Sequence, residues 1–162
     1  MRLPQKDNRK KGISIIEILV VIFIIGVALT SLFKVATFSL KFSGRLKENQ
    51  RALALAQEAM EAARNFRDGK NWSTNGLGSL SLDTAYHSAT TADLVPAWNL
   101  ALGEETIGIY QRKIIFSRVF RDTNDNISPS GTEDPGTRKV TVTISWPGKS
   151  INLVNYLTDW RQ

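Results

Sequence analysis

The chain has 162 residues, of which 42% are apolar and 22% charged, and this length suits one domain with a modest core. It contains no cysteine and one histidine, which excludes disulfide frameworks, thiolate metal sites and thiol nucleophiles and leaves little for a histidine-based triad. Lysine and arginine number 21 against 15 aspartates and glutamates, and the net charge of +6 raises nucleic acid or an anionic membrane as a partner.

Residues 13–33 read ISIIEILVVIFIIGVALTSLF, a run of 21 residues with one charge. A helix needs about 20 apolar residues to cross a bilayer, so this run predicts a transmembrane helix. Residues 1–12 carry five cations and one acid, with Arg9, Lys10 and Lys11 next to the run. Dense positive charge before a span predicts a cytoplasmic N-terminus and a single pass through the membrane.

Glu17 is the charge inside this apolar run. A carboxylate among Ile and Val side chains costs on the order of 3 kcal/mol, which favours a functional role. The alternative is a glutamate that snorkels to the interface or is protonated.

The sequence KKG followed by ISIIEILVVIFIIGVAL, with Glu17 the fifth residue after Gly12, resembles the class III signal of type IV pilins and type II secretion pseudopilins over residues 9–40. The resemblance implies that a prepilin peptidase cleaves the Gly12–Ile13 bond and methylates the new amine of Ile13. A glycine before the bond suits this, because it removes side-chain bulk. Ile13 departs from the Phe or Met that is frequent at this position. The span also lacks the proline of many major pilins, which favours minor pilins or pseudopilins.

The resemblance also implies the partners. It implies storage in the cytoplasmic membrane among lipids, then transfer by an inner-membrane assembly platform into a pilus or pseudopilus of other pilin subunits. Glu17 would neutralise the N-terminus of a neighbouring subunit, because two opposite charges in an apolar medium attract strongly. A single-span membrane protein with no filament role is the alternative.

Residues 34–67 continue the helical pattern without proline. An apolar face is formed by a seven-residue repeat and by the positions beside it, namely Leu46, Leu53, Met60 and Arg67 with Ala56, Ala59, Ala63 and Phe66. This predicts an amphipathic helix that ends at Asp68–Gly69. Packing beneath a small sheet is favoured over a coiled-coil dimer, because the alanine-rich face is narrow for a coiled-coil seam.

The C-terminal part is predicted to be rich in strands. Residues 68–105 read as a connecting loop with short strands near 85–89 and 97–102, with Trp72 and Trp98 packed on the core. Residues 106–121 predict one long, bulged strand. Alternation in 138–146 places Val140, Val142, Ile144 and Trp146 inward, and Pro147–Gly148 turns the chain into a partner strand.

The expected organisation is a leader at 1–12, a transmembrane helix at 13–33, its amphipathic continuation at 34–67, a connecting loop with short strands at 68–105 and an antiparallel β-sheet head at 106–162. One long helix on a three- or four-stranded antiparallel meander is an α+β architecture, which resembles the type IV pilin-like fold. The stretch ALAQEAMEAARNFR and the late hairpin are most similar to those of minor pilins and small pseudopilins.

Two further sites are weighed in the head. The residues Asp122, Asn124, Asn126, Ser130 and Glu133 have the spacing of a calcium loop, but Ile127 stands where the loop needs glycine, so a polar hairpin with Asx turns is favoured. A DNA-uptake or adhesive pilin is an alternative function. It would rest on a basic patch of Arg112, Lys113, Arg118, Arg121, Arg138 and Lys139 with aromatic neighbours.

The distribution of charge argues against nucleic acid. Residues 1–12 hold +4 and residues 34–67 hold +4, whereas residues 68–162 hold 9 cations and 10 acids. Charges that solvate edge strands are therefore favoured over a nucleic-acid site, and DNA stays an unsupported partner. With no phosphate-binding glycine loop and no paired acids, the chain is not predicted to be an enzyme, and neither catalytic residues nor a metal or cofactor is expected.

Overall fold

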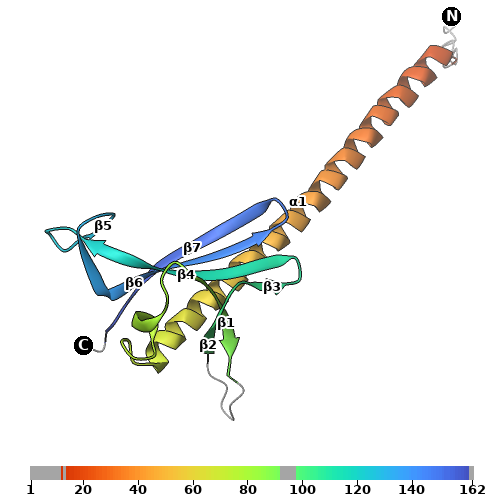
Figure 1. The fold of residues 1–162 in the computed structure, drawn as a ribbon. Helices are drawn as coiled ribbons and strands as arrows, with labels where there is room; N and C mark the ends of the chain where they lie inside the picture. The colour runs from red at the N-terminus through yellow and green to blue at the C-terminus, as the bar shows by residue number, and fades with distance from the viewer. Residues whose placement is uncertain (1–11, 13, 92–97, 161–162) are drawn as a thin grey trace, which may run out of the picture. The chain divides into compact units, whose positions relative to one another are not determined.

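A computed structural model describes residues 12, 14–91 and 98–160 of the chain (Figure 1). The chain divides into two compact units, Met1–Leu46 and Lys47–Gln162, and each is described by itself. The predicted roles of Arg9, Lys10, Lys11 and Ile13 fall on residues outside those described.

The first unit is built on the helix α1, which spans Ile15–Gly69 and continues into the second unit. Its residues up to Leu46 are exposed, and they are mostly Ile, Val, Leu, Phe and Ala. The hydroxyl groups of Thr30, Ser31 and Thr37 donate to backbone carbonyls three or four residues earlier, at 2.8–3.0 Å. The hydrogen-bonding groups of these side chains therefore find their partners within the helix, as polar groups in an apolar medium must.

The second unit joins the last part of α1 to one antiparallel sheet. The strand order is β2-β1-β4-β6-β7, and β3 and β5 each pair with β4. The strands are β1 (Ala85–Thr90), β2 (Trp98–Leu102), β3 (Glu105–Ile107), β4 (Tyr110–Arg121), β5 (Ile127–Ser128), β6 (Thr132–Trp146) and β7 (Lys149–Thr158), and a short 3-10 helix η1 covers Leu77–Ser79. The α+β architecture is as expected and matches the type IV pilin fold.

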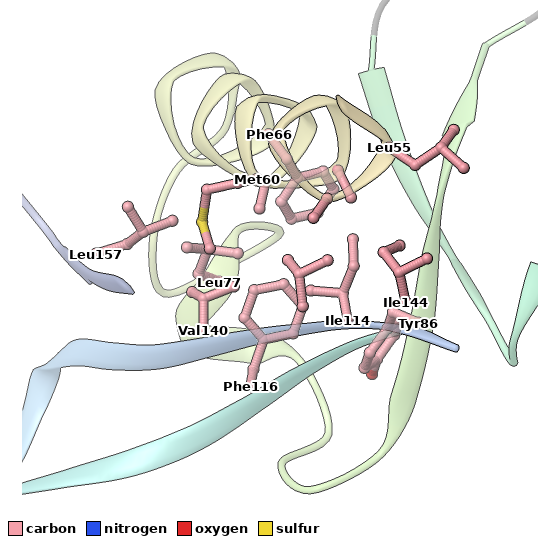
Figure 2. Close-up of a cluster of buried hydrophobic side chains, with 14 of the residues drawn as sticks. Leu55, Met60, Phe66, Leu77, Tyr86, Ile114, Phe116, Val140, Ile144 and Leu157 are labelled. Atoms are coloured by element: carbon pink, nitrogen blue, oxygen red, sulfur yellow. The ribbon is translucent and has the colours of Figure 1, made fainter. Parts of the chain in front are cut away.

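The core lies between α1 and the sheet. Figure 2 shows Ile114, Phe116 and Val140 rising from the strands toward Met60 and Phe66 of the helix. The helix contributes four alanines to the same cluster, which let its backbone approach the sheet closely. They are Ala52, Ala56, Ala59 and Ala63.

The buried face of the helix agrees with the predicted one except at two leucines. Met60 is buried as expected, but Leu46 and Leu53 are each 48% exposed. The neighbouring positions predicted for this face are buried, and Leu55 is buried beside them; the confirmed residues are Ala56, Ala59, Ala63 and Phe66. Met60 lies at the margin of this buried face, and Leu53, which a seven-residue spacing places about 20° further around a straight helix, falls outside it.

The segment 106–121 was predicted to be one strand, but it contains the end of β3, a turn and the long strand β4. β3 and β4 pair across the two residues Gly108 and Ile109, with Ile107 opposite Tyr110. Gly108 has a φ of +61°, which glycine adopts without steric cost, so the turn forms here. The predicted bulge is present, since the register of β4 against β6 shifts between Arg118 and Phe120.

The sheet also has more strands than predicted. A meander of three or four strands would place neighbours in chain order, whereas β1 lies between β2 and β4. The short strands expected near 85–89 and 97–102 are present as the antiparallel pair β1 and β2, although Ala97 lies outside the described residues. They join the sheet through Ala85 and Tyr86, opposite Ile115 and Ile114.

The late hairpin is confirmed. β6 and β7 pair from Thr137–Thr158 to Trp146–Lys149 around the turn at Pro147–Gly148. The inward residues of β6 are buried as predicted; these are Val140, Val142, Ile144 and Trp146. Trp72 is buried, and its Nε1 donates to the carbonyl of Pro135 at 3.1 Å. Trp98 is only half-buried and lies outside the core cluster, so its predicted role was wrong.

Candidate functional site

The N-terminal end of α1 carries the predicted processing site. Gly12 is exposed, and no atom lies within 4 Å of the position that a Cβ would take. The helix begins at Ile15, and the carbonyl of Ser14 accepts from the N–H groups of Glu17 and Ile18 at 3.0 and 3.3 Å. Gly12 therefore precedes the regular helical hydrogen bonds of α1.

Glu17 lies in the first turn of α1 with its side chain exposed. Three or four residues further along the helix, Val20 and Val21 occupy the same face, and both are exposed. Within the described residues no hydrogen bond or ion pair reaches the Glu17 carboxylate. The first turn thus presents an unpaired acid in an apolar surface, and such a charge needs a partner once water is removed.

The apolar surface around Glu17 is large. Large apolar side chains from Ile15 to Phe33 are all about half exposed or more. Soluble monomers rarely expose a contiguous apolar patch of this size, so lipid or protein must cover it. In the described part of the chain, α1 is the helix that is long and apolar enough to cross a membrane.

The basic patch that the alternative DNA-binding role would need is largely neutralised, because acids pair with most of its members. Lys113 Nζ lies 2.9 Å from Glu104 Oε1, and Arg118 Nε lies 3.7 Å from Glu133 Oε1. Arg138 is buried, with its guanidinium 5.9 Å from the centre of the Trp72 ring. A phosphate backbone needs exposed, unpaired cations, so this head offers little for DNA.

Arg121 is neutralised in the same way. Its Nε donates to Asp134 Oδ2 at 2.7 Å, and this hydrogen bond is the main reason why the pKa of Arg121 is raised. Burial alone would raise the pKa of Asp134. Hydrogen bonds from Arg121, from the Thr137 hydroxyl and from the Gly136 N–H outweigh burial and lower that pKa below its ordinary value.

The loop once weighed as a calcium site is a polar turn. The Asp122 carboxylate accepts from the backbone N–H groups of Asn124 and Asn126 at 2.8 and 2.9 Å, which is an Asx-type arrangement. These bonds lower the pKa of Asp122. Glu133 faces Arg118 instead. The described residues contain no group of three or more acids or histidines that could hold a metal ion.

Sequence reasoning missed the most buried charge cluster of the head. The side chain of Arg112 is 3% exposed. Its Nε and Nη2 donate to Glu105 Oε2 at 3.0 and 2.6 Å, and its Nη1 donates to Glu58 Oε1 at 3.0 Å. The cluster links α1 to the β3–β4 hairpin. Arg112 shares the parity of Tyr110 and Ile114, and this was the available signal that it faces the core.

Comparison with known families supports the N-terminal interpretation. Residues 7–33 match the family model described as the prokaryotic N-terminal methylation motif. The match spans Gly12, Ile13 and Glu17 and indicates a class III signal of type IV pilin-like proteins. Neither a curated protein nor a solved structure gives a significant match to the chain.

Proposed function

We propose that this chain is a structural subunit of a type IV pilus or of a type II secretion-like pseudopilus, with no catalytic role. The methylation motif at residues 7–33, the exposed apolar helix and the α+β fold all support this proposal. The observation that carries it is Glu17, an unpaired acid five residues after Gly12 within an exposed apolar surface. A protein that only needed an anchor would gain nothing from this acid.

Processing comes first in the proposed sequence of events. The basic leader, with Arg9, Lys10 and Lys11, holds the N-terminus in the cytoplasm while α1 spans the inner membrane once. A prepilin peptidase cleaves after Gly12 and methylates the amine of Ile13. The exposed glycine ahead of the helix supports this step, because a peptidase binds an extended backbone.

Assembly follows when an inner-membrane platform moves the subunit from lipid into the filament. The ammonium of Ile13 in one subunit then pairs with Glu17 of a neighbour. Two unit charges 4 Å apart attract by about 4 kcal/mol at an effective dielectric constant of 20. This energy is large enough to select the one longitudinal position in which both charges are paired.

Replacing Glu17 with alanine tests the assembly step. We expect Glu17→Ala to insert in the membrane and to be cut after Gly12, but to be missing from sheared filaments. The measurement is the ratio of filament to membrane protein by immunoblot, with intact mass establishing the N-terminus. The matched control is Glu104→Ala, which removes an exposed acid from the head. Normal incorporation of Glu17→Ala would exclude the proposed pairing.

A DNA-uptake or adhesive minor pilin is the second candidate on the same scaffold. The pairing of Lys113, Arg118 and Arg121 with acids disfavours the DNA form of this role. Salt-sensitive binding of DNA to the head would favour it again. A single-span protein without a filament role predicts that Glu17→Ala changes nothing.

A further inference from the structure

Three cations follow the membrane-length run on one face of α1. Lys34, Lys41 and Arg45 are separated by seven and four residues, so their side chains lie along one line of the helix surface. All three belong to the first unit and are exposed. We call them the juxtamembrane basic stripe.

An apolar face runs beside this stripe. Val35, Phe38, Phe42 and Leu46 recur at helical spacing and are all exposed. The rings of Phe38 and Phe42 stack, with their centres 6.4 Å apart. A cationic face next to an aromatic and aliphatic face is the pattern of a helix in contact with a lipid interface.

The chain itself does not neutralise the stripe. Among the described residues, no acid forms an ion pair or a hydrogen bond with Lys34, Lys41 or Arg45. Most cations of the head have such partners, as Lys113 and Arg121 do. The stripe's complement must therefore come from outside the chain, as an anionic surface.

The position of the stripe along α1 identifies that surface. Ile15 to Phe33 covers about 28 Å at 1.5 Å per residue, close to the roughly 30 Å of a hydrocarbon core. Lys34 therefore meets the bilayer boundary. Lys41 starts about 10 Å further on, and its side chain tilts toward the N-terminus and reaches back to the headgroups. Arg45 starts about 16 Å further on, and its guanidinium lies within about one Debye length of the anionic surface.

We propose that the juxtamembrane basic stripe binds the phosphates of anionic phospholipid headgroups where α1 leaves the bilayer, with Phe38 and Phe42 set among the lipids. The proposal rests on the proposed function only in requiring that residues 15–33 span a membrane. It gives the unassembled subunit a fixed depth and selects anionic lipids around it.

The absence of cysteine allows a site-specific test, because one introduced cysteine takes one label. Full-length Ser39→Cys carries an environment-sensitive fluorophore and is reconstituted in vesicles of phosphatidylcholine with 20% phosphatidylglycerol. Bromine, which quenches the fluorophore, is placed on one lipid at a time. We expect phosphatidylglycerol to be enriched at position 39 by about two- to threefold over its bulk share, and the enrichment to fall as salt is added.

Two variants with equal loss of charge provide the comparison. Lys34→Gln, Lys41→Gln and Arg45→Gln together should abolish the enrichment. Arg64→Gln, Lys113→Gln and Arg118→Gln in the head should leave it intact, because these cations are paired with acids. The proposal would be overturned if phosphatidylglycerol at position 39 matched its bulk share, or if the triple glutamine variant of the stripe kept the same enrichment. Either result would favour a neighbouring subunit as the occupant.

A second label separates this outcome from a failure of the proposed function. Ala28→Cys lies within the apolar run and should be quenched by both lipids in every variant if the run spans the bilayer. Quenching at position 28 without enrichment at position 39 refutes the lipid site alone. Loss of quenching at position 28 refutes the membrane span, and the lipid site with it.

Discussion

Replacing Arg112 with methionine should destabilise the head by about 2–3 kcal/mol. Methionine fills a similar volume, so the effect reports the lost charge interactions more than a cavity. The variant loses two hydrogen bonds to Glu105 and one to Glu58. It also leaves both carboxylates close to the core without their shared cation.

The solvent exposure of Glu58 and Glu105 determines how much stability the Arg112→Met variant should lose. Breaking a fully buried ion pair costs about 3–5 kcal/mol, because the remaining charge cannot be hydrated. Here the side chain of Arg112 is buried, but those of Glu58 and Glu105 are 47% and 33% exposed. Water can hydrate them in part, which lowers the expected cost to about 2–3 kcal/mol, or roughly 10 °C in Tm for a domain of this size.

Urea unfolding of residues 47–162 measures this free energy of unfolding. The fragment keeps the whole described core, whose first residue is Ala52. Lys113→Met is the matched control, since Lys113 is the next residue of β4 and pairs with the partly exposed Glu104. It should cost less than about 1 kcal/mol. Equal effects of Arg112→Met and Lys113→Met would refute the argument from burial.

The remaining predictions concern packing and pH. Phe116→Ala should lower the free energy of unfolding by about 3–5 kcal/mol, because Phe116 is fully buried between the sheet and α1. Ile115→Ala, on the other face of β4, should cost clearly less in the same urea titration, and similar costs would contradict the assigned faces. A second prediction concerns the loss of stability at low pH. Folding lowers the pKa of Asp122 and of Asp134, so the unfolded chain binds more protons than the folded chain in acid. Their contribution to the free energy of unfolding is therefore present above the ordinary pKa near 4 and is lost as the pH falls through the pKa values of the folded state. The urea concentration at the midpoint of unfolding should therefore decrease when the pH is lowered below about 4. Asp134→Asn should flatten this dependence, and an unchanged acid profile would count against the Arg121–Asp134 pair.

The sequence predicted those features that depend on local pattern. The long helix follows from an apolar run and strong helix formers without proline, and the β6–β7 hairpin follows from strict alternation around Pro147–Gly148. Glu17 was identified because an acid within an apolar run has a free-energy cost whether lipid or protein surrounds the run. The roles of Gly12, Ile13 and Glu17 stay predictions.

Other features depend on contacts that no local pattern encodes. The pairing of β1 with β4 joins segments that are distant in sequence, and only the folded sheet defines it. The buried position of Arg112 was missed, because its two acidic partners lie on β3 and on α1 and only the fold brings them together.

The described core begins at Ala52, although α1 begins at Ile15. Glu48 still contacts the strands, since its carbonyl accepts from the Tyr110 hydroxyl and its carboxylate pairs with Lys149, but these contacts and the whole described core lie within the second unit. The first unit can exchange lipid for protein neighbours while the head keeps one set of contacts throughout. Under the proposed function, the head of the subunit needs no refolding step when its membrane helix moves from lipid into the filament.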